Sequence, residues 1–154
     1  MSMMKKAISA YGQASIDLVV ESASPHQLIV MLYEGAIKSV VTARFQMEQG
    51  KIAEKGAAIS KAIAILDDGL RLALDHEQGG ELVENLDRLY EYLSFQLLTA
   101  NINNDVNALV HVIEILTQLK DAWQSIGPNQ LNAGLAVSQE KGEVARDAAS
   151  YGKA

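Results

Sequence analysis

The sequence contains no cysteine, and this absence excludes several kinds of chemistry at once. Without thiols there is no disulfide framework, no thiolate nucleophile and no thiolate metal site. A cysteine-free chain fits a reducing compartment, so we expect a cytosolic protein. The first residues, Met1 to Lys6, are not followed by a continuous apolar segment with a small-residue cleavage site, so no signal peptide is predicted.

Basic residues and long apolar runs are also scarce. The 13 Lys and Arg are outnumbered by 19 Asp and Glu, which gives a formal charge of -6, and they are scattered along the chain. Binding to a phosphate backbone needs a concentrated basic face, so nucleic acid is not an expected partner. The longest run of large apolar residues, 28–32, is far shorter than the roughly 18 residues of a membrane-spanning helix. Direct membrane insertion is therefore not expected.

Aliphatic side chains are abundant, and only two prolines interrupt them. Apolar residues at three- and four-residue spacing predict four long helices, over residues 25–49, 53–76, 81–102 and 106–126. Short connections force neighbouring helices to run antiparallel. We expect an all-α fold: an antiparallel four-helix bundle in one domain over residues 1–127, with a short N-terminal cap helix or arm. Residues 128–154 are expected to form a flexible tail with one transient helix over about 135–149.

The three histidines form no recognisable catalytic or metal site. A di-metal site in a four-helix bundle needs Glu three residues before His, and here alanines precede His26, His76 and His111 at that distance. A phosphotransfer bundle would carry its phosphoryl group on His111, but Glu114 nearby would repel the incoming anion. We expect no enzymatic activity, no cofactor and no metal. A catalytic bundle that uses His111 is kept as the alternative function.

The predicted helices carry more apolar surface than a single bundle axis can hide. On the third helix, a separate stripe lies opposite the core face and comprises Tyr92, Phe95, Leu98 and Ile102. On the fourth helix, a second arc adjoins the predicted core face and comprises Val112, Ile115, Leu119 and Ile126. Both rows are expected to be covered by something. A partner helix, a homodimer and the chain's own terminal segments are alternatives that the pattern leaves open.

Several short motifs resemble the FliS family of flagellar secretion chaperones. The longest runs from Ser24 to Ala36 with the pattern Ser-Pro-x-x-Leu-Ile-x-Met-Leu-Tyr-x-Gly-Ala. Tyr11 precedes it, and further matching segments follow at the family's distances, at residues 61–62, 89–92, 97–101 and 122–123. Two features depart from the family: Glu34 stands where Asp is common, and the tail beyond Gly127 is longer than the recognisable region.

The resemblance implies an export chaperone. Such a protein binds the C-terminal helical segment of flagellin, prevents its premature polymerisation and presents it to the membrane-embedded gate of the flagellar type III export apparatus, without ATP or metal. By the same likeness, Ile8 and Tyr11 lie in a motile N-terminal arm that covers a groove when no client is bound. The expected partner-binding residues are these two and the two apolar rows. The expected partners are flagellin and the export gate protein, and a homodimer of the client-free chain remains an open alternative.

Overall fold

A computed structural model describes residues 24–127, and the first helix within them begins at a capping box. Ser24 Oγ accepts a hydrogen bond from the backbone N–H of Gln27 (3.2 Å), and Gln27 Oε1 accepts one from the N–H of Ser24 (3.1 Å). Pro25 occupies the first turn, where a missing N–H costs no helical hydrogen bond. The helix, α3, spans Pro25–Glu48, and the chain then turns at Gly50, whose φ of +73° lies in the left-handed region. The predicted start at Ser24 is confirmed.

The second helical segment is not one continuous α-helix. α4 spans Ile52–Ile65 and runs directly into a π-helical turn, η1, at Leu66–Leu70. A π turn adds a residue to the helix and shifts the direction of the side chains that follow. The prediction of a single helix reaching His76 is therefore wrong, because the apolar spacing continues through the π turn and does not reveal it.

α5 spans Gly80–Asn103 and α6 spans Val106–Ile126, and a tight turn joins them. Asn104 adopts a left-handed conformation with φ of 55°, which Asn tolerates better than most residues. Asp105 caps α6 by accepting a hydrogen bond at Oδ1 from the N–H of Ala108 (3.1 Å). The predicted bounds of both helices are confirmed to within a residue.

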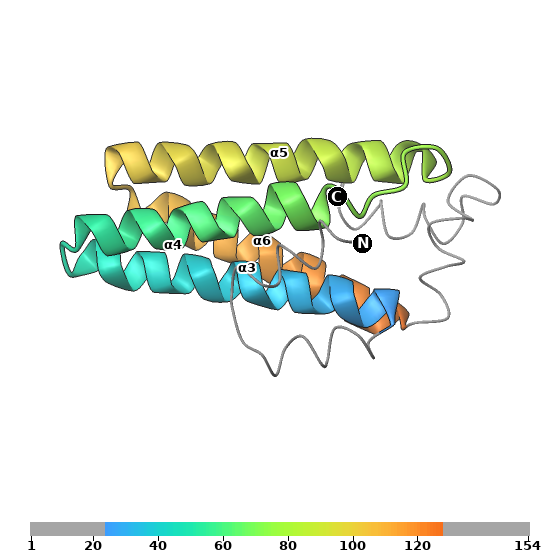
Figure 1. Ribbon diagram of the computed structural model, residues 1–154, viewed down its shortest axis with the longest axis horizontal. Coiled ribbons are helices and arrows are strands. Elements are labelled where there is room, and N and C mark those ends of the chain that lie inside the picture. The colour runs from blue at the N-terminus through green and yellow to red at the C-terminus, as the bar shows by residue number, and fades with distance from the viewer. Residues whose placement is uncertain (1–23, 128–154) are drawn as a thin grey trace.

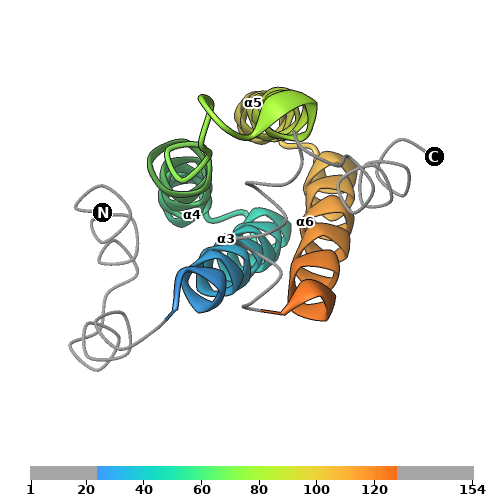
Figure 2. The ribbon, with the colours of Figure 1, turned by 90° about the vertical axis from the view of Figure 1, so that its right-hand side faces the viewer.

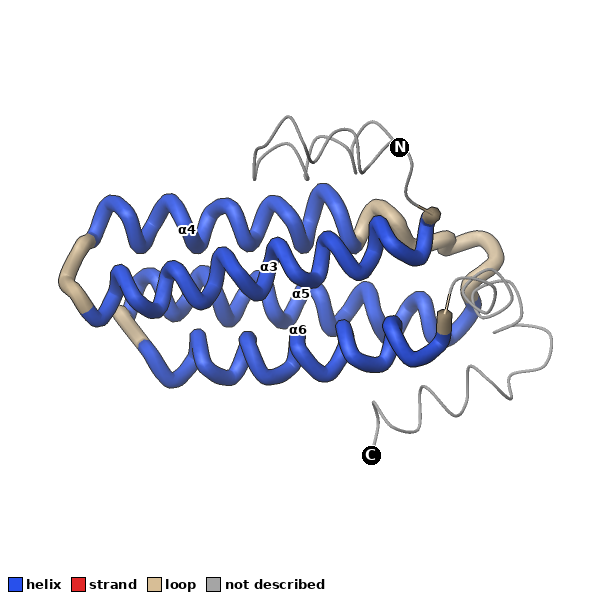
Figure 3. Tube along the Cα trace, turned by 90° about the horizontal axis from the view of Figure 1, so that it is seen from below, coloured by secondary structure: helices blue, strands red, loops and turns tan. Residues whose placement is uncertain are grey.

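The four helices form an antiparallel bundle in which α3 and α5 lie diagonally opposite each other, separated by α4 and α6 (Figures 1 and 2). The α3–α4 and α5–α6 turns lie at one end, and the start of α3 lies beside the end of α6 at the other (Figure 3). There, Nε2 of His26 donates a hydrogen bond to the backbone carbonyl of Trp123. The predicted all-α bundle is confirmed over these residues. The predicted N-terminal arm and C-terminal tail lie outside them.

The core takes fully buried aliphatic side chains from every helix, for example Leu32, Ile59, Leu93 and Leu116. Each such side chain gains roughly 1.5–3 kcal/mol when it leaves water. Because the apolar faces of all four helices meet along one axis, this burial fixes the helices relative to one another.

A pair of tyrosine hydroxyls is enclosed in that core. The hydroxyls of Tyr33 and Tyr90 are hydrogen-bonded to each other, and the two rings lie 6.4 Å apart with a tilt of 56°. Desolvation raises the pKa of both tyrosines above the ordinary value, so the hydroxyls stay protonated. The pair therefore links α3 to α5 across the bundle.

Candidate partner-binding surface

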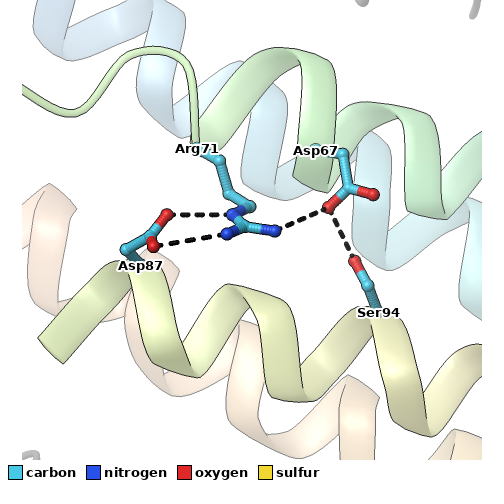
Figure 4. A network of polar contacts seen from close by, with 4 residues as sticks. All are labelled: Asp67, Arg71, Asp87 and Ser94. Carbon is cyan, nitrogen blue, oxygen red and sulfur yellow. Dashed lines mark hydrogen bonds and ion pairs between the residues drawn. The ribbon is translucent and has the colours of Figure 1, made fainter. Parts of the chain in front are cut away.

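Charged and polar groups fill the seam between α5 and the π turn (Figure 4). Arg71 donates from Nε to Asp87 Oδ1 (2.9 Å) and from Nη2 to Asp87 Oδ2 (3.3 Å). Its Nη1 lies 3.7 Å from Asp67 Oδ1, which also accepts a hydrogen bond from Ser94 Oγ (3.0 Å). The hydrogen bond from Arg71 lowers the pKa of Asp87 below its ordinary value. This flank of α5 is therefore closed by an ion-pair network.

A buried lysine closes the same flank nearer the end of α5. Lys55, on α4, is only 5% exposed, and its Nζ donates to the backbone carbonyl of Asn101 (3.0 Å) and to Asn104 Oδ1 (3.1 Å). Both acceptors lie at the C-terminus of α5, where unpaired carbonyls and the helix dipole favour a cation. Polar contacts thus hold α5 against its neighbour along most of its length.

On its other flank, α5 contacts α6 through Tyr92 and His111. The Tyr92 hydroxyl lies 3.0 Å from Nε2 of His111, and the two rings meet edge to face with centroids 6.0 Å apart. His111 is thus engaged with the Tyr92 side chain. Within residues 24–127, no three His, Asp or Glu side chains are grouped so that they could hold a metal ion.

Between these two seams, α5 presents apolar side chains to the outside. We call Tyr92, Phe95, Leu98 and Ile102 the α5 row. They are 41%, 62%, 50% and 73% exposed, respectively. The row runs from Tyr92 to Ile102, eleven residues of helix or about 15 Å, within roughly a third of the circumference. All four residues of the third-helix stripe identified in the sequence lie here, on a surface that no described part of the chain covers.

The row expected on α6 is placed differently. Val112 is fully buried, whereas Ile115, Leu119 and Ile126 are partly buried and pack against the core. The core face of α6 is marked by its buried residues, Leu109, Val112, Leu116 and Trp123. The expectation that Val112 lies on an outer surface is wrong. The sequence places two apolar arcs of similar width side by side on this helix and does not reveal which one faces inward. In the structure, the buried face is centred on the boundary between the two arcs.

Four other large apolar side chains are exposed in the described residues, and none of them is on α5. Val41 and Phe45 are on α3, diagonally across the bundle, and their four-residue spacing was visible in the sequence. Ile52 begins α4, and Leu72 follows η1. Single exposed apolar residues and pairs of them are common on soluble proteins, so the four-residue α5 row stands out. Ile8 and Tyr11, expected from the family resemblance to contact a partner, lie outside the described residues.

The family pattern described as "Flagellar protein FliS" matches residues 5–130 of the chain. The chain belongs to the FliS family. The flagellar secretion chaperone FliS of Salmonella typhimurium is 49% identical over 121 residues, which cover 79% of this chain and 90% of that protein. The flagellar secretion chaperone FliSB of Pseudomonas aeruginosa is 47% identical over 121 residues, 79% of this chain and 95% of that protein. FliS of Vibrio cholerae is 39% identical over 129 residues, 84% of this chain and 94% of that protein.

FliS membership makes this chain a chaperone of flagellar export and not an enzyme, so the catalytic alternative built on His111 is dropped. The FliS match contains all four helices and the whole α5 row, and it ends at residue 130, a few residues beyond α6. No helix in the described part of the chain is long and apolar enough to cross a membrane.

Proposed function

We propose that this chain acts in the cytosol, where it binds the C-terminal helical segment of flagellin, keeps it from polymerising and delivers it to the gate of the flagellar type III export apparatus. The observation that carries the proposal is the α5 row, a contiguous apolar surface in which Phe95, Leu98 and Ile102 are each at least half exposed. An amphipathic helix binds such a surface by covering apolar side chains at helical spacing. The names of the relatives, which are flagellar secretion chaperones, support a client from the flagellum.

The proposed contact surface extends from the α5 row to the outer edge of α6. Tyr92 lies beside His111, and Ile115, one turn further along α6, remains partly exposed. Leu119 and Ile126 continue this edge towards the end of α6. Contact by Ile8 and Tyr11, and delivery to the export gate, are proposed on the family resemblance alone.

The test is a titration of the full chain with a synthetic peptide of the flagellin C-terminal segment, followed by size-exclusion chromatography with light scattering. We expect a one-to-one complex, because the row is long enough for a few turns of one guest helix. A peptide of the same composition in scrambled order, which loses the apolar stripe, is the matched control and should not bind. No complex with the native peptide, or equal binding of both peptides, would rule out this client.

A further inference from the structure

The C-terminal segment is the main part of this chain that the FliS match leaves out. The match ends at residue 130, whereas the chain continues to Ala154. α6 ends at Ile126, so residues 128–154 follow almost directly from the last helix of the bundle. Any role of this segment is therefore an addition to the shared bundle.

The sequence of this segment repeats an apolar residue at every seventh position, at Val137, Val144 and Tyr151. Drawn as a helix, one arc of roughly 80° holds five apolar residues, Ala133, Val137, Val144, Ala148 and Tyr151. Lys141 is the one charged residue within that arc, and the long stem of a lysine can lie along an apolar surface. A narrow stripe with this period is typical of a helix that lies along another helix.

The α5 row lies within reach of this segment. Because α5 and α6 are antiparallel, Gly127 lies at the end of the bundle where α5 begins (Figure 1). At 1.5 Å per residue, the row from Tyr92 to Ile102 lies about 18 to 33 Å from Gly80 along α5. Residues 128–132 can extend over about 17 Å, and a helix over 133–151 would be about 27 Å long. The segment can therefore cover the whole row.

Charge does not oppose such a contact. The acidic excess of the chain, -6, lies within the described bundle, whereas the segment beyond residue 130 has as many basic as acidic residues. Its basic residues are Lys141, Arg146 and Lys153, and its acidic residues are Glu140, Glu143 and Asp147. A neutral segment is not repelled by an acidic surface, and its lysines and arginine can approach the exposed carboxylates of α5.

We propose that residues 133–151 of this chain dock as an amphipathic helix on the α5 row when no client is bound. The inference rests on the proposed function, since it makes the tail a competitor for the surface that receives flagellin. A tethered segment has an effective concentration on the order of 1 mM, so an intrinsic dissociation constant of about 1 mM already covers the row half of the time. Half coverage weakens the apparent affinity for a client about twofold, and tighter docking weakens it further.

The absence of cysteine allows a direct test by crosslinking in the full chain. Phe95→Cys combined with Val144→Cys places one thiol in the row and one in the tail stripe. Thr42→Cys combined with Val144→Cys is the control, because Thr42 is exposed on α3, diagonally opposite α5. Phe95→Cys combined with Ile8→Cys tests the N-terminal arm as the occupant instead. Each variant is treated with a short bismaleimide at low protein concentration, and intramolecular product is followed by mass spectrometry.

We expect the pair at positions 95 and 144 to crosslink roughly tenfold faster than the pair at 42 and 144, because docking raises the local concentration of the two thiols. Equal rates for these pairs would overturn the proposal. Fast crosslinking between positions 8 and 95, with none between 95 and 144, would also overturn it and assign the row to the arm.

A second measurement separates this proposal from the proposed function. Val144→Asp is expected to raise the affinity of the full chain for the flagellin peptide by about twofold or more, whereas Leu135→Asp, on the opposite side of the tail helix, is expected to leave it unchanged. Equal affinities for these two variants would overturn tail competition. If the peptide binds no variant but positions 95 and 144 still crosslink, tail docking stands and the flagellin proposal fails.

Discussion

Phe95 offers the sharpest test of the α5 row as a client surface. Its side chain is 62% exposed, so about three-fifths of the free energy of burying a phenylalanine is still available to a partner. Full burial gains roughly 1.5–3 kcal/mol, and a helix that covers the exposed part would gain about 1–2 kcal/mol. Phe95→Ala is therefore expected to weaken binding of the flagellin peptide by a factor of roughly 5 to 30.

The assay is isothermal titration of the peptide into each variant, with thermal unfolding followed by circular dichroism. Leu72→Ala is the matched control, because Leu72 is 54% exposed but lies after η1, outside the row. Both side chains are mostly exposed, so each substitution should change the free energy of unfolding by less than about 1 kcal/mol. The reasoning is refuted if Phe95→Ala binds the peptide within about twofold of the parent, or if Leu72→Ala loses as much affinity.

Three further predictions concern the bundle. Tyr33→Phe should lower the free energy of unfolding by about 1–3 kcal/mol, because it leaves the buried Tyr90 hydroxyl without this partner. Adding Tyr90→Phe should recover part of that loss in urea unfolding, and additive losses from the two substitutions would contradict this. Gly79→Ala should lower the free energy of unfolding by about 1–3 kcal/mol, because its Cβ would lie 1.7 Å from a buried valine side chain. Gly56→Ala is the control: its Cβ would have no contact within 4 Å, so it should be neutral or stabilising. Equal melting temperatures for the two variants would be inconsistent with that contrast. The lowered pKa of Asp87 means that its ion pair stabilises the fold above the unfolded pKa of about 3.9 and is lost as pH falls through the lower folded value. Asp87→Asn should therefore flatten the acid limb of the unfolding free energy, and an unaltered limb would count against this ion pair.

Helix ends could be predicted from the sequence where the signal is local. Ser24 and Gln27 complete each other's hydrogen bonds within one turn, and Asp105 caps α6 in the same way, so neither depends on the rest of the fold. The end of α4 could not be predicted, because its π turn is accompanied by contacts to α5 through Arg71 and Asp67. Those partners are distant in sequence, and apolar spacing does not report them.

The candidate surface could be predicted on α5 but not on α6, because only on α5 does the sequence of the helix itself define the buried face. The α5 row lies opposite a core face marked by Leu86, Leu93 and Leu97, so its outward direction follows from the helical period. On α6 the apolar residues extend around so much of the helix that the helical period does not indicate which face is buried. Only packing against α3 and α5 decides that Val112 is buried and Ile115 is not, and that information is absent from a single helix.

The hydrogen bond between His26 and the carbonyl of Trp123 places the beginning of α3 against the end of α6, so the two ends of the described bundle are neighbours. A short linker from Gly127 to Ser24, with a new opening in the turn at Gly50, would give a circularly permuted chain. Every contact between helices would be kept in that permutant, while the free ends would move to the opposite pole of the molecule. Its folding would test whether the order of the helices along the chain matters for their assembly.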